Sequence, residues 1–268
     1  MARPFKKNKK PDRTHRSGKA KSGASRSPSR NHDWIYGRHA VLAALANPDR
    51  KILQIMATNN ATRDFGDLTG KTGLSLTTST TSEISAQLPP GAVHQGIAIK
   101  IQPLKEVGLD DIALDRPVLV LDQVTDPHNV GAMMRSAAVF NASTLIMTRR
   151  NSPPLSGVLA KSACGALEHV DVVFVGNLSQ ALKELAKIGF WRIGLDGQAE
   201  NALEASVDAS RNNQPIALVL GAEDKGMRRL TTEQCDELCH ITTTGILASL
   251  NVSNAAAIAL HVLSKPKF

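Results

Sequence analysis

Aromatic side chains and long apolar runs are both scarce in this sequence of 268 residues. Phenylalanine, tryptophan and tyrosine together make up 3% of the chain. The longest apolar stretches, such as 117–121 and 216–220, are far shorter than the roughly 20 residues that a membrane-spanning helix needs. The amino-terminal residues also lack the apolar segment of a secretory signal. The sequence therefore predicts a cytoplasmic protein that has no membrane partner.

Cysteine is equally sparse. The three cysteines, Cys164, Cys235 and Cys239, cannot all pair, which indicates a reducing compartment. Cys235 and Cys239 are one helical turn apart and His240 follows them, so this stretch has the residue types of a metal site. A pair of thiols on one face of a helix explains it better, because no second pair of ligands appears elsewhere in the sequence. We therefore expect no metal.

Several common nucleotide and hydrolase signatures are missing as well. No Gly-x-Gly-x-x-Gly segment follows a strand, and no phosphate-binding loop ends in Gly-Lys-Ser or Gly-Lys-Thr. These absences argue against an ordinary dinucleotide-binding fold and against a nucleoside triphosphatase. The absence of a Gly-x-Ser-x-Gly segment also weakens a hydrolase interpretation.

The formal net charge of +8 comes entirely from the amino terminus. Residues 1–30 hold eleven lysines and arginines against the single acid Asp12, whereas the remainder has 21 bases and 23 acids. Residues 1–32 contain too few apolar side chains to support a core, so we expect a disordered basic arm. Such an arm suits the phosphates of a nucleic acid, since neutralising them releases counterions. A solubilising tail or an address signal is the alternative.

Apolar periodicity predicts an α/β module over residues 33–102. In this region we expect a helix over 36–45, ended by Asn47-Pro48, and two more over 61–72 and 82–88, the last capped by Ser82. Strands are expected over 52–57, 74–78 and 95–101. Residues 103–116, with a proline, a glycine and several acids, read as a linker.

Residues 117–268 alternate strands and helices more clearly. The expected strands are 118–124, 144–147, 170–175, 191–195 and 216–220, and the expected helices are 129–140, 157–167, 178–188 and 253–263. Asn129 is the expected cap of the first of these helices, and 197–214 reads as a polar loop. This alternation predicts a mainly parallel sheet with helices on both of its faces.

Three polar clusters follow apolar strands of this second unit. They are 129–135, 220–227 and 249–254, and each lies where a strand gives way to a turn or a helix start. Taken singly, each has an ordinary explanation: Arg135 in a surface ion pair, Glu223 at a helix start, and Ser249 and Asn251 as helix caps. Open α/β folds place ligands at the carboxyl ends of their strands. The three clusters together therefore predict a single site and an enzyme.

The same residues resemble a known family. Leu121–Ala137 is similar to the first motif of the SpoU (TrmH) family of RNA 2′-O-ribose methyltransferases, Leu218–Leu230 to the second and Ile246–Ala256 to the third. Their order and spacing match, and the likeness extends from about residue 117 to about residue 263. Residues 36–41 with 94–97 also resemble, over a shorter length, the amino-terminal domain of the bacterial 23S rRNA guanosine-2′-O-methyltransferases.

This resemblance implies a trefoil-knotted methyltransferase domain of the SPOUT type, preceded by a small α/β substrate-binding domain like a ribosomal protein. It implies a homodimer that binds S-adenosyl-L-methionine in a bent conformation. The cofactor-binding residues would be Gly221, Ile241 and Leu250, acting largely through their backbone groups, and the catalytic residues would be Arg135, Asn129, Glu223, Ser249 and Asn251. One departure is Thr242-Thr-Thr244, where many relatives have an apolar stretch that contains proline.

The implied reaction is the attack of a ribose 2′-oxygen on the methyl carbon of a sulfonium. Arg135 is the family's candidate to take the hydroxyl proton, but a guanidinium normally keeps its own proton. We favour the hypothesis that Arg135 holds an RNA phosphate and polarises the 2′-hydroxyl. The favoured substrate is a guanosine of 23S rRNA. The alternatives are a tRNA 2′-O-methyltransferase and a non-catalytic RNA-binding relative.

Overall fold

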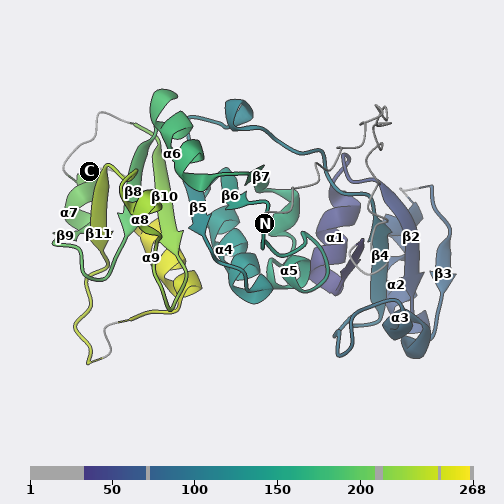
Figure 1. Cartoon of the computed structure of the whole chain (residues 1–268). Helices are drawn as coiled ribbons and strands as arrows, with labels where there is room; N and C mark the ends of the chain where they lie inside the picture. Colours follow the sequence, from purple (N-terminus) through teal and green to yellow (C-terminus); the bar gives the residue numbers. More distant parts are fainter. Residues whose placement is uncertain (1–32, 71–72, 209–213, 247–248, 266–268) are drawn as a thin grey trace, which may run out of the picture.

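The computed structural model describes residues 33–70, 73–208, 214–246 and 249–265. These residues form two α/β units, and residues between β4 and β5 connect them (Figure 1). The predicted basic arm, 1–32, lies outside the described residues. None of the described helices is long and apolar enough to cross a membrane.

The smaller unit contains a four-stranded sheet in the order β1-β4-β2-β3. Its strands are β1 (Trp34–Tyr36), β2 (Ile52–Ala57), β3 (Leu76–Thr78) and β4 (Ile97–Ile101), and its helices are α1 (Arg38–Ala46), α2 (Asn59–Gly70) and α3 (Thr81–Ala86). The predicted cap Ser82 is wrong. Thr80 caps α3, because its side chain accepts from the backbone N–H of Glu83 while the Glu83 carboxylate accepts from the backbone N–H of Thr80.

The larger unit contains a seven-stranded sheet in the order β7-β6-β5-β10-β8-β11-β9, and every pair of neighbouring strands is parallel. Its strands are β5 (Val118–Asp122), β6 (Thr144–Thr148), β7 (Asp171–Val175), β8 (Trp191–Leu195), β9 (Asn201–Ala202), β10 (Ile216–Gly221) and β11 (Glu237–His240). The predicted parallel α/β sheet is confirmed.

Helices cover both faces of this sheet. They are α4 (Pro127–Val139), α5 (Gly157–Ser162), α6 (Leu178–Lys187), α7 (Leu203–Asp208), α8 (Arg229–Thr232) and α9 (Val252–Ser264), with short 3₁₀ turns η1 (Leu109–Asp111) and η2 (Ala166–Glu168). Alternate residues of β5 face opposite layers: Leu119 and Leu121 pack with α4 and α9, whereas Val118 and Val120 pack with α6. Both faces of β5 are therefore covered by helices, and all five of its residues are buried.

Three sequence predictions in this unit are wrong. The expected loop 197–214 contains β9 and α7, because Leu203 is fully buried in the main apolar core. Asp126, not Asn129, caps α4: its carboxylate accepts from the backbone N–H of His128, and proline follows it at the first helical position. Cys235 and Cys239 do not share a helix, since Cys239 lies in strand β11. No group of potential metal ligands occurs among the described residues.

A buried ion pair joins the two units. Arg50 of the smaller unit donates from Nη2 to Glu168 Oε1 at 2.8 Å and from Nε to Glu168 Oε2 at 3.0 Å. The two side chains are 2% and 1% exposed, and Asn47 adds a third hydrogen bond to Glu168 at 2.7 Å. Nearby, a β-carbon at Gly165 would lie 2.6 Å from the Ala43 side chain, so the two backbones meet closely there. The apolar core is also continuous between the units.

His94 lies at a second contact between the units. Its Nδ1 accepts from the backbone N–H of Gly96 at 3.1 Å, its Nε2 is 3.2 Å from Ser85 Oγ, and Lys161 of α5 donates to the Val93 carbonyl at 2.5 Å. Burial lowers the pKa of His94, and the charge of Lys161 lowers it further. The folded chain therefore keeps this imidazole neutral at pH values where the unfolded chain protonates it.

The stability of the protein is therefore expected to fall as the pH decreases below 6.5, the ordinary histidine value. Chemical unfolding of the wild type and of His94→Gln, above and well below that pH, measures the effect. The wild type should lose more of its free energy of unfolding on acidification than the variant. An equal loss in both proteins would show that His94 is not the group responsible.

Candidate active site

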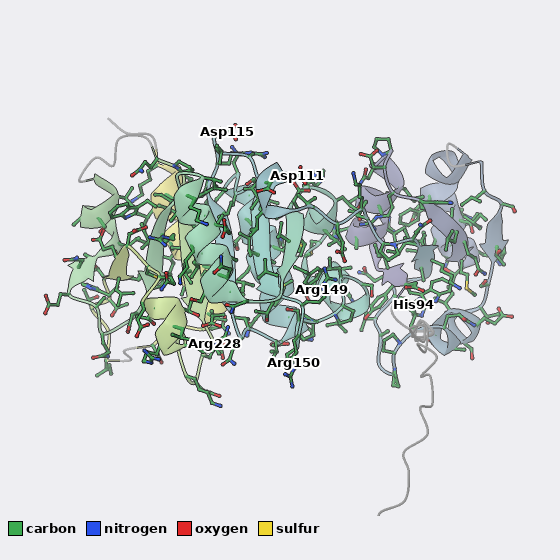
Figure 2. The ribbon with its side chains drawn as sticks, turned by 45° about the horizontal axis from the view of Figure 1, so that its top comes forward. His94, Asp111, Asp115, Arg149, Arg150 and Arg228 are labelled. Atoms are coloured by element: carbon green, nitrogen blue, oxygen red, sulfur yellow. The ribbon has the colours of Figure 1, made fainter. Side chains whose placement is uncertain are left out.

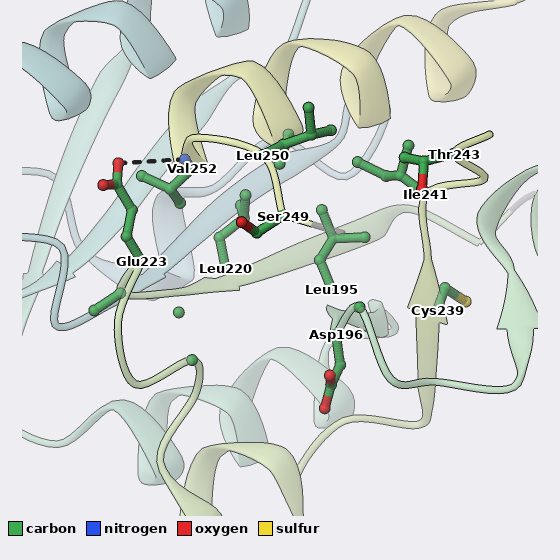
Figure 3. Close-up of a pocket in the computed structure, with 15 residues that line it drawn as sticks. Leu195, Asp196, Leu220, Glu223, Cys239, Ile241, Thr243, Ser249, Leu250 and Val252 are labelled. Atoms are coloured by element: carbon green, nitrogen blue, oxygen red, sulfur yellow. Dashed lines mark hydrogen bonds between the residues drawn. The ribbon is translucent and has the colours of Figure 1, made fainter. Parts of the chain in front are cut away.

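A pocket of 190 Å³ opens at the carboxyl ends of β8, β10 and β11. Figure 3 shows residues from the loops after these strands turned toward one space, with Leu195 and Asp196 opposite Ser249 and Leu250. The three predicted cofactor residues, Gly221, Ile241 and Leu250, all line it. So do Glu223 and Ser249 of the predicted catalytic set.

Gly221 allows the loop after β10 to fold back tightly on the strand. A β-carbon at this position would lie 2.1 Å from the carbonyl carbon of Gly226 and 2.2 Å from the backbone nitrogen of Met227. Gly226 has a positive φ of 61°, and its N–H donates to the Ala222 carbonyl at 2.8 Å. This closure folds residues 222–226 into a short, tight lip at the edge of the pocket.

The Glu223 carboxylate connects the three polar clusters through hydrogen bonds. Its Oε1 accepts from Asn129 Nδ2 at 2.8 Å, from Asn251 Nδ2 at 2.5 Å and from the Val252 backbone N–H at 3.4 Å. Asn251 Nδ2 also donates to Asn129 Oδ1 at 3.1 Å, while Asn251 Oδ1 caps α9 by accepting from Ser253 N. The sequence distances of 94, 28 and 122 residues between the three side chains show that only the fold brings them together.

Arg135 stands apart from this cluster. It lies on the exposed side of α4, and its Nη1 is 3.5 Å from Cys164 Sγ, which in turn is 3.5 Å from the Lys161 carbonyl oxygen. Cys164 adopts a positive φ of 51°, which turns its thiol back toward α4. The structure therefore brings together four of the five predicted catalytic residues at or beside one pocket, and leaves Arg135 outside it.

Sequence reasoning missed two carboxylates near the site. Asp196 follows β8 and lines the pocket. Asp122 ends β5, is 0% exposed, and accepts from the backbone N–H and Nε of Arg228, both at 2.8 Å. Asp122 belongs to the first recognised motif, so its position directly after a buried strand was the available signal. Thr243, within the departure at 242–244, also lines the pocket.

The sequence profile of the SpoU rRNA Methylase family matches residues 116–261, which include every residue of this site. The chain belongs to the SpoU family. A second profile, RNA 2′-O ribose methyltransferase substrate binding, matches residues 34–107. The two matches cover the larger and the smaller unit respectively.

Several curated relatives carry the same name. The 23S rRNA (guanosine-2′-O-)-methyltransferase RlmB of Photorhabdus laumondii is 37% identical over 238 residues, which are 84% of this chain and 95% of that protein. The protein of the same name from Escherichia coli K12 is 42% identical over 176 residues, which are 63% of this chain and 71% of that protein.

Solved structures agree on the fold. The AdoMet-bound rRNA methyltransferase of Sinorhizobium meliloti superimposes with a TM-score of 0.72 at 20% identity, covering 86% of this chain and 85% of that one. The SpoU methyltransferase AviRb of Streptomyces viridochromogenes, in complex with AdoMet, has a TM-score of 0.70 at 18% identity, covering 86% and 88%. Both units of the present chain therefore have a counterpart among SpoU structures.

Proposed function

We propose that this chain is an S-adenosylmethionine-dependent RNA 2′-O-methyltransferase that modifies the ribose of a guanosine in 23S rRNA. The observation that carries the proposal is the hydrogen-bonded cluster of Asn129, Glu223 and Asn251 beside the pocket at the carboxyl ends of β8, β10 and β11. Its support from relatives is the name shared by two curated proteins that are 37% and 42% identical to this chain.

The lining of the pocket fits S-adenosylmethionine. The apolar side chains of Leu195, Leu220 and Ile241 suit an adenine ring, while Asp196 suits ribose hydroxyls and Glu223 adds negative charge for a cationic ligand. Bound there, the cofactor supplies an electrophilic methyl carbon on a positively charged sulfur. The closed lip at Gly221 presents backbone groups to it, as the family resemblance implies.

The protein's own contribution is mainly positioning. Glu223 fixes the amides of Asn129 and Asn251, and Asn251 holds the start of α9 behind the pocket. Ser249, at the pocket wall, orients the RNA ribose that is methylated. Arg135 holds an RNA phosphate and polarises the 2′-hydroxyl, whose proton passes to solvent water late in the transfer.

The working form is a homodimer. Arg135 and Val139 are four residues apart and therefore lie on the same side of α4, where Val139 is 69% exposed. Ile258 of the adjacent helix α9 is 38% exposed. A second copy that covers these apolar side chains also meets Arg135, which brings the guanidinium to a site built by both copies. Sedimentation of the wild type and of Val139→Asp tests this, the variant being expected as a monomer.

The remaining family features are part of the same proposal. Residues 33–102 form the RNA substrate-binding domain, 103–116 the linker and 117–268 the trefoil-knotted catalytic domain, with a basic arm over 1–32. The return of α9 onto α4 and β10 is the packing that supports the knot. The three cysteines form no disulfide with one another, which supports a cytoplasmic location.

Transfer of labelled methyl from S-adenosylmethionine to purified large-subunit rRNA and, separately, to bulk tRNA tests the function. Label is expected in rRNA ribose. Label in tRNA alone would assign the activity to tRNA instead. RNA binding without label or cofactor binding would make the chain a non-catalytic relative.

Replacing Glu223 with alanine is expected to lower kcat about tenfold to 100-fold, because three donors lose their common acceptor and the motifs shift apart. Steady-state kinetics with rRNA measures this. Asp171→Ala, which removes an exposed acid at the start of β7, at the opposite edge of the sheet, is the control and should retain kcat. Equal activity of Glu223→Ala and the wild type would contradict the proposed role.

A further inference from the structure

A second, polar cavity lies beside the cofactor pocket. This groove has a volume of 570 Å³ and is built at the carboxyl ends of β5, β6, β7 and β10. Ala222 lines both the groove and the pocket, so only the lip at 222–226 separates them. A ligand in the groove therefore lies next to the proposed cofactor pocket.

Cations and hydrogen-bonding side chains form the groove wall. Arg150, Lys225 and Arg228 supply positive charge, and Asp224 is the one acid lining it among the described residues. Arg150 and Lys225 are exposed, and within the described part of the chain neither has a carboxylate partner. Figure 2 shows Arg150 and Arg228 at the same edge of the larger unit.

Arg228 is held in place by Asp122. The fully buried Asp122 binds its backbone N–H and Nε, and the Nη2 of Arg228 lies 2.7 Å from Asp122 Oδ1. This leaves Nη1 of a fixed, planar guanidinium facing outward, with 47% of the side chain exposed. A fixed guanidinium beside two free cations is the arrangement that recognises phosphate oxygens.

The backbone around the groove is also strained. Gln123 and Asn151 both line it, and both adopt positive φ angles, 61° and 69°. Such conformations are uncommon for a residue other than glycine and concentrate at ligand sites. The loop after β6 is braced by Thr148 Oγ1, which donates to the Arg150 carbonyl at 3.1 Å. This hydrogen bond fixes the backbone of Arg150 at the groove wall.

We propose that this groove binds the phosphodiester backbone of the RNA next to the nucleotide that is methylated, with Arg150 and Lys225 contacting phosphate oxygens and Arg228 as a fixed donor. The inference rests on the proposed function for the identity of the RNA. The polar wall excludes a largely apolar ligand, and the groove shares its lip with the site of methyl transfer.

The test combines the exposed substitutions Arg150→Gln and Lys225→Gln in one variant and compares it with Lys183→Gln/Lys187→Gln on α6. Affinity for large-subunit rRNA is measured over a series of salt concentrations, with KM for methyl transfer and the Kd for S-adenosylmethionine alongside. The groove variant should bind rRNA at least tenfold more weakly. Its log–log salt slope should be smaller by about 1.4, since each phosphate contact contributes about 0.7. Cofactor affinity and melting temperature should match the wild type.

An unchanged affinity and salt slope in the groove variant would overturn the proposal, as would an equal loss in the α6 control. Arg150→Lys, which keeps the charge, should recover most of the affinity. Failure of the wild type to methylate any RNA would refute the proposed function but leave the salt slope readable. The two failures are therefore distinguishable.

Discussion

Replacing Arg135 with alanine is expected to lower kcat for methyl transfer by about 10²- to 10³-fold, the range found when one positioned donor that stabilises the charge developing in the transition state is removed. Arg135 is exposed on α4, so the variant should keep the melting temperature of the wild type. The cofactor Kd should also be unchanged, because Arg135 does not line the pocket. Single-turnover transfer to rRNA, with cofactor binding measured separately, checks both statements.

The pH dependence of Arg135→Lys separates two roles for the guanidinium. If Arg135 only holds phosphate and polarises the hydroxyl, the lysine variant keeps the shape of the wild-type pH–rate profile at reduced height. A rising limb present in the wild type and lost in Arg135→Lys would favour a general base. Cys164→Ala is the matched control: it removes the contact to Nη1 and should change kcat by less than tenfold.

Replacing Glu168 with alanine is expected to lower the free energy of unfolding by about 3–5 kcal/mol. The change leaves the Arg50 guanidinium buried, with its charge uncompensated and two of its hydrogen bonds lost. Asn47 loses its acceptor at the same time. Denaturant unfolding at neutral pH measures the loss.

Two further variants show whether the buried charge is the cause. Glu233→Ala breaks the exposed pair with Arg229 and should cost less than about 1 kcal/mol. Arg50→Met/Glu168→Leu removes both charges together and should be more stable than Glu168→Ala alone. If the double variant were as unstable as the single one, the loss would come from packing and not from the unpaired charge.

The sequence predicted the centre of the larger sheet well and its margin poorly. The continuous apolar run of β5 and the alternation on either side of it marked a buried parallel strand. At the margin, β9 has two residues and β11 mixes a buried Cys239 with polar neighbours, so neither shows strand periodicity. β1 was not predicted: the helix expected over 36–45 included only its last residue, Tyr36, and three apolar residues have no period of their own.

The site divides in the same way. Local motifs identified Asn129, Glu223 and Asn251, and their common position after strands predicted that they would meet. The partners that depend on three-dimensional packing had no local signal: Asp196 is an isolated carboxylate, and Cys164 reaches Arg135 only through a left-handed backbone. The ion pair of Arg50 with Glu168 joins residues 118 positions apart, and no sequence pattern near either residue predicts its partner.

The buried contact between the two units fixes the distance between their surfaces. With Glu168 clamped by Arg50 and Asn47, and Gly165 seated against Ala43, the segment connecting β4 and β5 cannot act as a free hinge. The two units then present their surfaces at a fixed distance from each other. An RNA that contacts both units at once binds more tightly, because the two contact surfaces are held at a fixed distance. An RNA whose folded shape does not match that distance can contact only one unit and binds more weakly. If both units bind the RNA, as the proposed function requires, the choice of the target nucleotide depends on the folded shape of the RNA, and the buried ion pair sets the spacing that the shape must match.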